Sequence, residues 1–100
     1  MYNIIIMDFD YNRDKNEWLK ENRKVSFEDA VDSINSKRHL LGDVKHFNQT
    51  RYPNQRIFII KIKRYVYLVP YVLDLNRNVK FLKTIYANRK LKKLYENKQK

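Results

Sequence analysis

The sequence predicts a single α+β domain in which helices pack on an antiparallel sheet. Apolar residues recur with helical spacing in the first third of the chain, whereas in the second half they alternate with the two-residue period of strands. The chain has 100 residues, the length of one domain, and its one Gly and two Pro are too few for a flexible linker. We expect residues 1–100 to form one unit with the element order β-α-α-β-β-β-α.

The first third of the chain predicts a strand followed by a helix. Residues 2–9 are mostly β-branched and apolar, as in a strand. Residues 12–23 are mostly charged helix formers, and the apolar edge of this segment consists of Trp18 and Leu19. We expect Trp18 to anchor this helix in the core between the helices.

A second helix is predicted by a stronger start signal. Ser26 and Asp29 have the spacing of a capping box, in which the side chain of each residue accepts a hydrogen bond from the backbone of the other. The helix is expected to end near residues 35–36. Its apolar residues share one helical face: Phe27, Ala30, Val31 and Ile34.

Residues 37–55 predict a long loop, because they show little periodicity and contain the loop formers Gly42, Asn48, Pro53 and Asn54. Loops of this length in small domains are often functional.

The second half predicts three antiparallel strands joined by short turns. Pro70 lies inside the middle strand and predicts a bulge or an edge position there, because proline has no N–H to donate to a neighbouring strand. The expected strands cover residues 56–63, 65–73 and 79–86, with turns at residues 63–64 and 76–78.

The last quarter of the chain is strongly basic. Residues 77–100 contain nine Lys or Arg and one acidic residue, whereas residues 1–35 contain five basic and eight acidic residues. A segregated positive field concentrates a polyanion on one face, so RNA is the first candidate partner and an acidic protein surface the second. A solvated surface rich in lysine is the alternative without binding. Residues 88–98 predict a closing helix whose inward-facing residues are expected to be Leu91, Leu94 and Tyr95.

Composition argues against several classes of function. The absence of cysteine excludes disulfides and thiolate zinc sites, and two histidines are too few for a histidine-only structural metal site. Without a glycine-rich phosphate loop we expect no nucleotide cofactor. The chain has no apolar run near the ~20 residues of a membrane helix and no signal-peptide pattern, so we expect a cytoplasmic protein. Asp8 and Asp10 share a strand face, but a polar strand end is favoured there over a divalent-ion site.

Basic, aromatic and histidine side chains remain as candidates for chemistry. Metal-free RNA cleavage needs a group that moves protons and cations that stabilise the phosphate as negative charge develops. His46, in the predicted loop, is a side chain that gives or takes a proton near neutral pH. The cations able to hold a phosphate are Arg51, Lys83, Arg89 and Lys90. Tyr52 and Tyr86 are the aromatic candidates for stacking a base.

Each of these residue types also has a purely structural interpretation. A lone histidine in a loop is more often a surface hydrogen-bonding residue than a catalyst. Exposed strand lysines such as Lys61 and Lys63 commonly prevent edge pairing, and strand tyrosines are usually half-buried packing residues.

Segments along most of the chain resemble the BrnT family of toxins. Phe9, the pair Lys15-Asn16 and the run VSFEDA at residues 25–30 match the N-terminal pattern of that family without gaps. A common branch of the family resembles the second half at four further segments: YPNQRIF at 52–58, YVYLVPYV at 65–72, FLKTI at 81–85 and RK at 89–90. The resemblance spans residues 9–95.

This resemblance implies a RelE-like fold and a type II toxin that arrests translation as a ribonuclease. It also implies neutralisation by a ribbon-helix-helix or similar DNA-binding antitoxin. The chain departs from the family pattern at three places. Arg23-Lys24 stands where the family has His-Gly, Phe47 follows His46 where the branch has proline, and Ala87-Asn88 stands where the branch has Pro-Ser.

We therefore expect a metal-independent endoribonuclease toxin without a small-molecule cofactor. Lys83 and Arg89 are predicted to bind the phosphate in the transition state, and His46 is predicted to transfer a proton. The residues predicted to bind RNA are Lys15, Arg51, Tyr52, Tyr86 and Lys90. One alternative is a non-catalytic RNA- or ribosome-binding module that uses the same basic face. Another is a basic C-terminal segment that docks an acidic partner protein.

Overall fold

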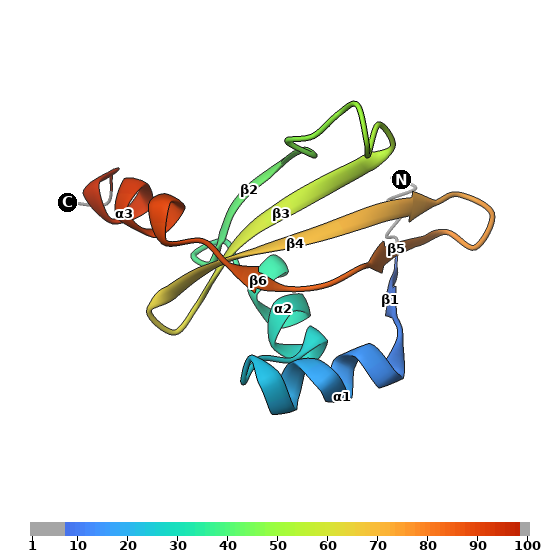
Figure 1. Ribbon diagram of the computed structural model, residues 1–100, viewed down its shortest axis with the longest axis horizontal. Helices are drawn as coiled ribbons and strands as arrows, with labels where there is room; N and C mark the ends of the chain where they lie inside the picture. Colours follow the sequence, from blue (N-terminus) through green and yellow to red (C-terminus); the bar gives the residue numbers. More distant parts are fainter. Residues whose placement is uncertain (1–7, 99–100) are drawn as a thin grey trace, which may run out of the picture.

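A computed structural model of the chain describes residues 8–98 (Figure 1). Residues 2–7 of the expected first strand lie outside the described residues. The elements, in chain order, are β1 (Asp8–Tyr11), α1 (Arg13–Asn22), α2 (Phe27–Ile34), β2 (Leu40–Lys45), β3 (Gln55–Ile62), β4 (Tyr65–Asp74), β5 (Val79–Leu82), β6 (Tyr86–Ala87) and α3 (Arg89–Lys98). Over this range, none of the helices has both the length and the apolarity that crossing a lipid bilayer requires.

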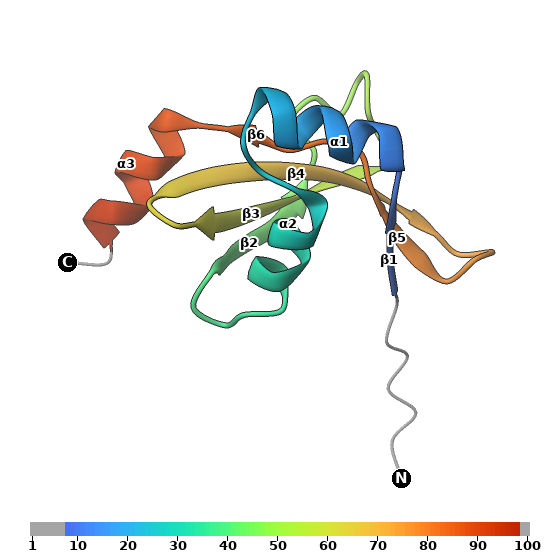
Figure 2. The same cartoon turned by 90° about the horizontal axis from the view of Figure 1, so that it is seen from below.

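The strands form one six-stranded sheet in the order β1-β5-β4-β3-β2, with β6 also paired to β4. β2, β3, β4 and β5 pair antiparallel in turn, which confirms the predicted meander, and the α+β class is confirmed. β1 pairs with β5 in parallel, so the sheet is mixed and not wholly antiparallel as predicted. Figures 1 and 2 place α3 at the end of the sheet where β3 joins β4, away from α1 and α2.

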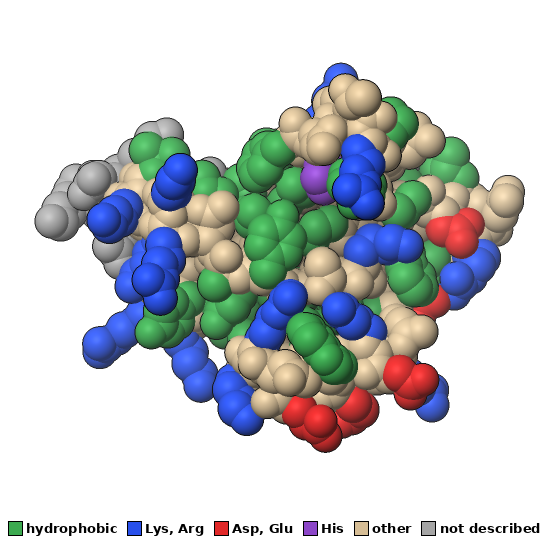
Figure 3. Space-filling model, viewed as in Figure 1, with side chains coloured by type: hydrophobic (Ala, Val, Ile, Leu, Met, Phe, Trp, Pro, Cys, Tyr) green, Lys and Arg blue, Asp and Glu red, His purple; other side chains and the backbone are tan. Residues whose placement is uncertain are grey.

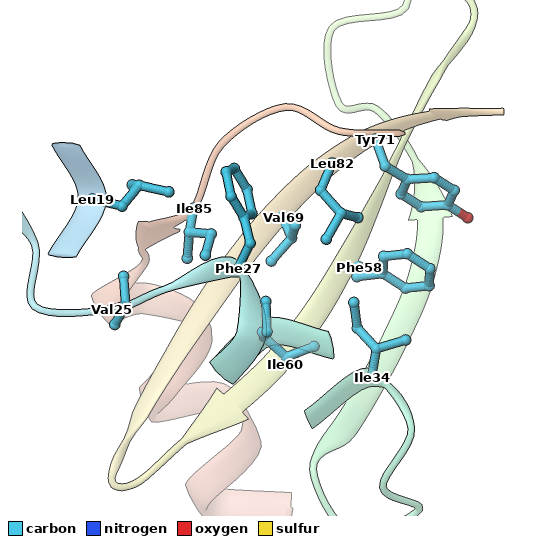
Figure 4. Packing of buried hydrophobic residues seen from close by; sticks show 11 residues of the cluster. Leu19, Val25, Phe27, Ile34, Phe58, Ile60, Val69, Tyr71, Leu82 and Ile85 are labelled. Atoms are coloured by element: carbon cyan, nitrogen blue, oxygen red, sulfur yellow. The ribbon is translucent and has the colours of Figure 1, made fainter. Parts of the chain in front are cut away.

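Two apolar clusters cover the two faces of the sheet. The larger one packs α1 and α2 on the sheet, and Figure 4 shows Leu19 and Phe27 directed toward the strand residues Val69 and Leu82. The smaller cluster, on the opposite face, consists of Ile57, Ile59, Val66 and Leu68, with Tyr86 and Leu91 packed against them. We call this second face the open face, because α1 and α2 leave it uncovered.

The predicted loop at residues 37–55 contains a strand, so that prediction was wrong in part. β2 pairs antiparallel with β3 from Leu40 to Lys45, and the register shifts between Leu40 and Gly42. Gly42 favours a loop in the sequence, but it lies at this irregularity within a strand, where a glycine is common. The loop that remains runs from residue 46 to residue 54.

The predicted strand at residues 79–86 is interrupted, and Pro70 explains the interruption. β5 ends at Leu82 and β6 begins at Tyr86. Pro70 lies between the β5 and β6 pairings of β4, and its carbonyl accepts a hydrogen bond from the backbone N–H of Lys83. Because N and C=O of one strand residue point to the same side, the missing N–H of Pro70 faces this gap. Pro70 is therefore neither in an edge strand nor at a bulge with β3.

Two predicted core residues are exposed. Trp18 is 41 % exposed, whereas the next residue, Leu19, is fully buried and fills the place that was predicted for Trp18. In α3, Leu91 packs on the open face as expected, but Leu94 is exposed. The side chain of Tyr95 lies outside the part of the chain whose side chains are described.

The predicted start signal of α2 is confirmed. The Ser26 hydroxyl accepts a hydrogen bond from the Asp29 N–H at 3.0 Å, and the Asp29 carboxylate accepts one from the Ser26 N–H at 3.1 Å. Asn12 caps α1 through a hydrogen bond from the Lys15 N–H. Buried Asn16 joins the two helices, since its carbonyl accepts from the Phe27 N–H and its amide donates to Glu28.

We expect Ser26→Ala to lower the free energy of unfolding by about 1 kcal/mol, because it leaves a backbone N–H of the first turn of α2 without its acceptor. Urea unfolding monitored by circular dichroism measures the loss. Ser36→Ala, which removes the same hydroxyl outside any helix cap, is the matched control. Equal stability of the two variants would show that the cap contributes nothing.

Candidate nucleic-acid interface

The open face carries Lys83 and His46 on opposite sides of the sheet. Lys83 lies opposite Pro70, which in turn lies opposite Ile57 of β3, so Lys83 shares the face of Ile57. Its ammonium lies 5.5 Å from the centre of the Phe81 ring, two residues earlier. At the other side of the sheet, His46 continues β2, and its N–H donates to the Gln55 carbonyl.

The loop after β2 assembles three predicted site residues. The rings of His46 and Tyr52 have centres 4.5 Å apart, and the Arg51 guanidinium lies 5.4 Å from the centre of the Tyr52 ring. The Nδ1 atom of His46 accepts a hydrogen bond from the Asn48 N–H at 3.0 Å. Because Nδ1 is an acceptor, Nε2 carries the proton in the neutral ring. His46 is therefore arranged to donate from Nε2.

A polar network on the helix-facing side of the sheet supports this loop. The Tyr71 hydroxyl donates to the Asp43 carboxylate at 2.6 Å, and the Arg56 guanidinium pairs with the same carboxylate at 3.1 Å. Burial, followed by the hydrogen bond to Asp43, raises the pKa of Tyr71 far above its ordinary value. These contacts join β2, β3 and β4 at the strand ends from which the 46–54 loop leaves, so its base is held at both sides.

Arg89 and Lys90 lie in the first turn of α3, at the other end of the open face, and both are exposed. The Asn88 N–H donates to the Val66 carbonyl. The side-chain carbonyl of Asn88 accepts a hydrogen bond from the Leu91 N–H and so caps α3. A hollow of about 370 Å³ lies beside this turn. Its lining residues are Tyr65, Val66, Ala87, Asn88, Arg89, Lys92 and Lys93.

Tyr86 is half-buried in β6 and packs on the apolar cluster of the open face. Burial raises the pKa of its hydroxyl. Its contacts are those of a packing residue, with part of the ring left at the surface.

Register separates the three predicted catalytic residues. The His46 N–H bonds to Gln55 of β3, which pairs with Val72 of β4. The N–H of Asn88, directly before α3, bonds to Val66 of the same strand β4. Six strand residues span about 20 Å, so His46 and Arg89 lie at opposite ends of the sheet. Lys83, level with Pro70, is nearer to His46, although two strands stand between β2 and β5, a separation of about 14 Å. The structure therefore does not bring all three residues to one phosphate.

Lys15 belongs to a third group, on α1, that sequence reasoning found only in part. The Lys15 ammonium and the Arg23 guanidinium lie 4.2 and 4.8 Å from the centre of the Trp18 ring. Arg23 donates to the carbonyl of Ile85 and to the Thr84 hydroxyl, two residues that directly follow Lys83. The only signal for Arg23 was its place at a departure from the family pattern.

Positive charge on these groups is left uncompensated by carboxylates. Lys20, Arg56 and Arg77 form the salt bridges of the described side chains, and none of the predicted phosphate-binding residues takes part in them. Figure 3 shows Lys and Arg side chains around an apolar centre, with Asp and Glu toward the rim. The phosphate-binding candidates Lys15, Arg51, Lys83, Arg89 and Lys90 are therefore available to an anion.

Within residues 8–98, no three His, Asp or Glu side chains gather in a way that would hold a metal ion. Asp10, one of the two acids weighed for such a site, instead pairs with Arg77, and this hydrogen bond lowers the pKa of the Asp10 carboxyl. Comparison with protein-family models, curated proteins and solved structures finds no match to this chain.

Proposed function

We propose that this protein is a BrnT-like toxin of a type II toxin–antitoxin system, with a RelE-like fold and metal-independent endoribonuclease activity. The observation that carries the proposal is the open face, where the 46–54 loop and Lys83 present a histidine, cations and an aromatic ring that have no carboxylate partner among the described side chains. The motif resemblance along residues 9–95 supports the same function.

The proposed reaction is attack of a ribose 2′-hydroxyl, which loses its proton to solvent, on the adjacent phosphate. A 2′,3′-cyclic phosphate forms as the bond from phosphorus to the 5′-oxygen breaks. The charge that develops on the phosphate is stabilised by cations, of which Arg51 lies in the same loop as His46 and Lys83 lies nearer to His46 than Arg89 does. The Nε2–H of neutral His46 donates a hydrogen bond to the phosphate or to the leaving oxygen, and transfer of its proton requires the imidazolium, in which Nδ1 has released the Asn48 N–H. Because Arg89 lies about 20 Å from His46 along the sheet, we assign Arg89 and Lys90 to binding of neighbouring nucleotides.

Such a toxin acts in the bacterial cytoplasm and requires a partner that holds it inactive. A ribbon-helix-helix or similar DNA-binding antitoxin is the partner that this function implies. Carboxylates placed over Lys83 and Arg89 would attract the toxin from a distance and compete with RNA for the same charges.

Incubation of the purified protein with RNA in EDTA tests the activity. Discrete products that accumulate over many turnovers support a metal-independent nuclease. Full-length RNA that is shifted on a native gel but never cut would overturn the enzymatic assignment. The His39→Ala variant, which alters the other histidine, is purified in the same way and should cleave RNA as the wild type does.

A second candidate function is a non-catalytic RNA- or ribosome-binding module. The separation of His46, Lys83 and Arg89 favours it, because a binding surface needs cations spread along the RNA backbone and not converged on one phosphate. The same incubation discriminates, since this module shifts RNA without cutting it.

Binding of single-stranded RNA is expected to weaken steeply with salt. If about four phosphates are neutralised, the logarithm of the association constant falls with the logarithm of salt concentration with a slope of roughly −3. Fluorescence anisotropy with RNA that carries 2′-O-methyl groups, and so cannot be cleaved through the 2′-hydroxyl, measures the slope. Lys83→Ala should make it shallower by about 0.7. A slope near zero would show that the basic face does not contact phosphate.

A further inference from the structure

Trp18 stands on the surface of α1, and two cations lie over its ring. It is 41 % exposed, although α1 has a fully buried leucine at the next position. The Lys15 ammonium is 4.2 Å and the Arg23 guanidinium 4.8 Å from the centre of the indole ring. Since the core does not use Trp18, its indole is available to a ligand.

Arg23 fixes this group beside the predicted phosphate-binding region. The Arg23 guanidinium donates to the Thr84 hydroxyl at 3.4 Å and also to the Ile85 carbonyl. Both residues lie in the break between β5 and β6, immediately after Lys83. The group on α1 therefore lies beside the segment that directly follows Lys83, so an RNA strand bound at Lys83 has the indole within reach across the β5–β6 break.

An indole flanked by cations has the chemistry of a nucleotide-binding surface. Unpaired bases stack on aromatic rings, and the phosphates on either side of the base pair with Lys and Arg. An acidic peptide would use the two cations but would leave the flat ring without a matching partner. Lys15 must move from the ring to a phosphate, and its flexible four-carbon stem permits this.

We propose that Trp18 is a stacking platform for an unpaired RNA base, with Lys15 and Arg23 contacting the phosphates beside that base. The proposal rests on the proposed function, because it assumes that RNA is the ligand. It adds a second recognition point on α1, which selects unpaired over paired RNA because a base inside a duplex has no free face.

Trp18 is the only tryptophan of the chain, so its fluorescence reports on this site directly. We expect a single-stranded 2′-O-methyl RNA to quench the emission as the base stacks. Inorganic polyphosphate, which has charge but no bases, should bind with little quenching. The same oligonucleotide annealed to its complement should quench less than the single strand.

Affinities of variants complete the test. Trp18→Ala should weaken binding of the labelled single strand about 5- to 150-fold, and Trp18→Phe should restore part of it. Lys15→Ala should weaken binding, whereas Lys20→Ala, on the same helix but paired with Glu17, should not. Melting curves establish that the variants are folded.

The outcomes separate this proposal from the function on which it rests. RNA that binds without changing the emission, and equally well to Trp18→Ala, would overturn the role of Trp18 while leaving RNA binding intact. Equal quenching by polyphosphate and RNA would show anion contact without base stacking and would also overturn it. Failure of the wild-type protein to bind RNA at all would overturn both.

Discussion

Cleavage of RNA by the His46→Ala protein is expected to be about 10²–10⁴-fold slower than by the wild type at saturating RNA, the usual effect of removing a general acid or base. The reason lies in the orientation of the ring. Its Nδ1 accepts a hydrogen bond from the Asn48 N–H, so Nε2 is the atom that we propose contacts the RNA. Single-turnover rates measured with saturating protein isolate the chemical step.

The matched control is His39→Ala, which removes an exposed histidine from the segment before β2 and should leave the rate unchanged. Arg89→Ala is informative in another way. If Arg89 binds neighbouring nucleotides, its loss raises KM more than it lowers kcat. Undiminished cleavage by His46→Ala would remove the assignment of His46, and an Arg89→Ala protein with unchanged KM and kcat would remove that of Arg89.

The second large effect concerns stability. We expect Leu19→Ala to lower the free energy of unfolding by about 2–5 kcal/mol, because it deletes a fully buried side chain and leaves a cavity between α1 and the sheet. Each kcal/mol corresponds to roughly 4–8 °C in the melting temperature of a domain of this size. Thermal and urea unfolding of the variant beside the wild type measure the loss.

Trp18→Ala, one position away, is the contrasting variant. The indole is largely outside the core, so its removal is expected to change stability by only about 0.5 kcal/mol. A Trp18→Ala protein that is less stable than Leu19→Ala would show that Trp18, and not Leu19, anchors α1 on the sheet.

Local signals predicted the helical part of this fold well. The capping box of Ser26 and Asp29 and the apolar spacing that follows it determine α2 from neighbouring residues alone. The inward residue of α1 was assigned wrongly because only Trp18 and Leu19 are apolar there, and two adjacent residues do not define a helical face. Neighbouring elements decide the choice, and these are distant in sequence.

The strands and the site depended more on long-range pairing. β2 was missed because Gly42 resembles a loop residue until its pairing with β3 is known. The sequence predicted which residue types form the candidate site but not the distances between them. Those distances depend on the register of the strands, which places His46 and Arg89 at opposite ends of one face. Arg23 meets Thr84 across 61 positions of the chain, and no local pattern contains that contact.

The parallel pairing of β1 with β5 has a consequence for the order of folding. Asp8 lies beside Val79, about 70 positions later in the chain. The entropy of closing so long a loop opposes this contact until the β3-β4 hairpin and β5 already stand in place. During synthesis β1 therefore stays unpaired until β5, and with it most of the chain, has left the ribosome. Docking of β1 is expected to be a late step in assembly of the domain, after the segment that carries Lys83 has emerged.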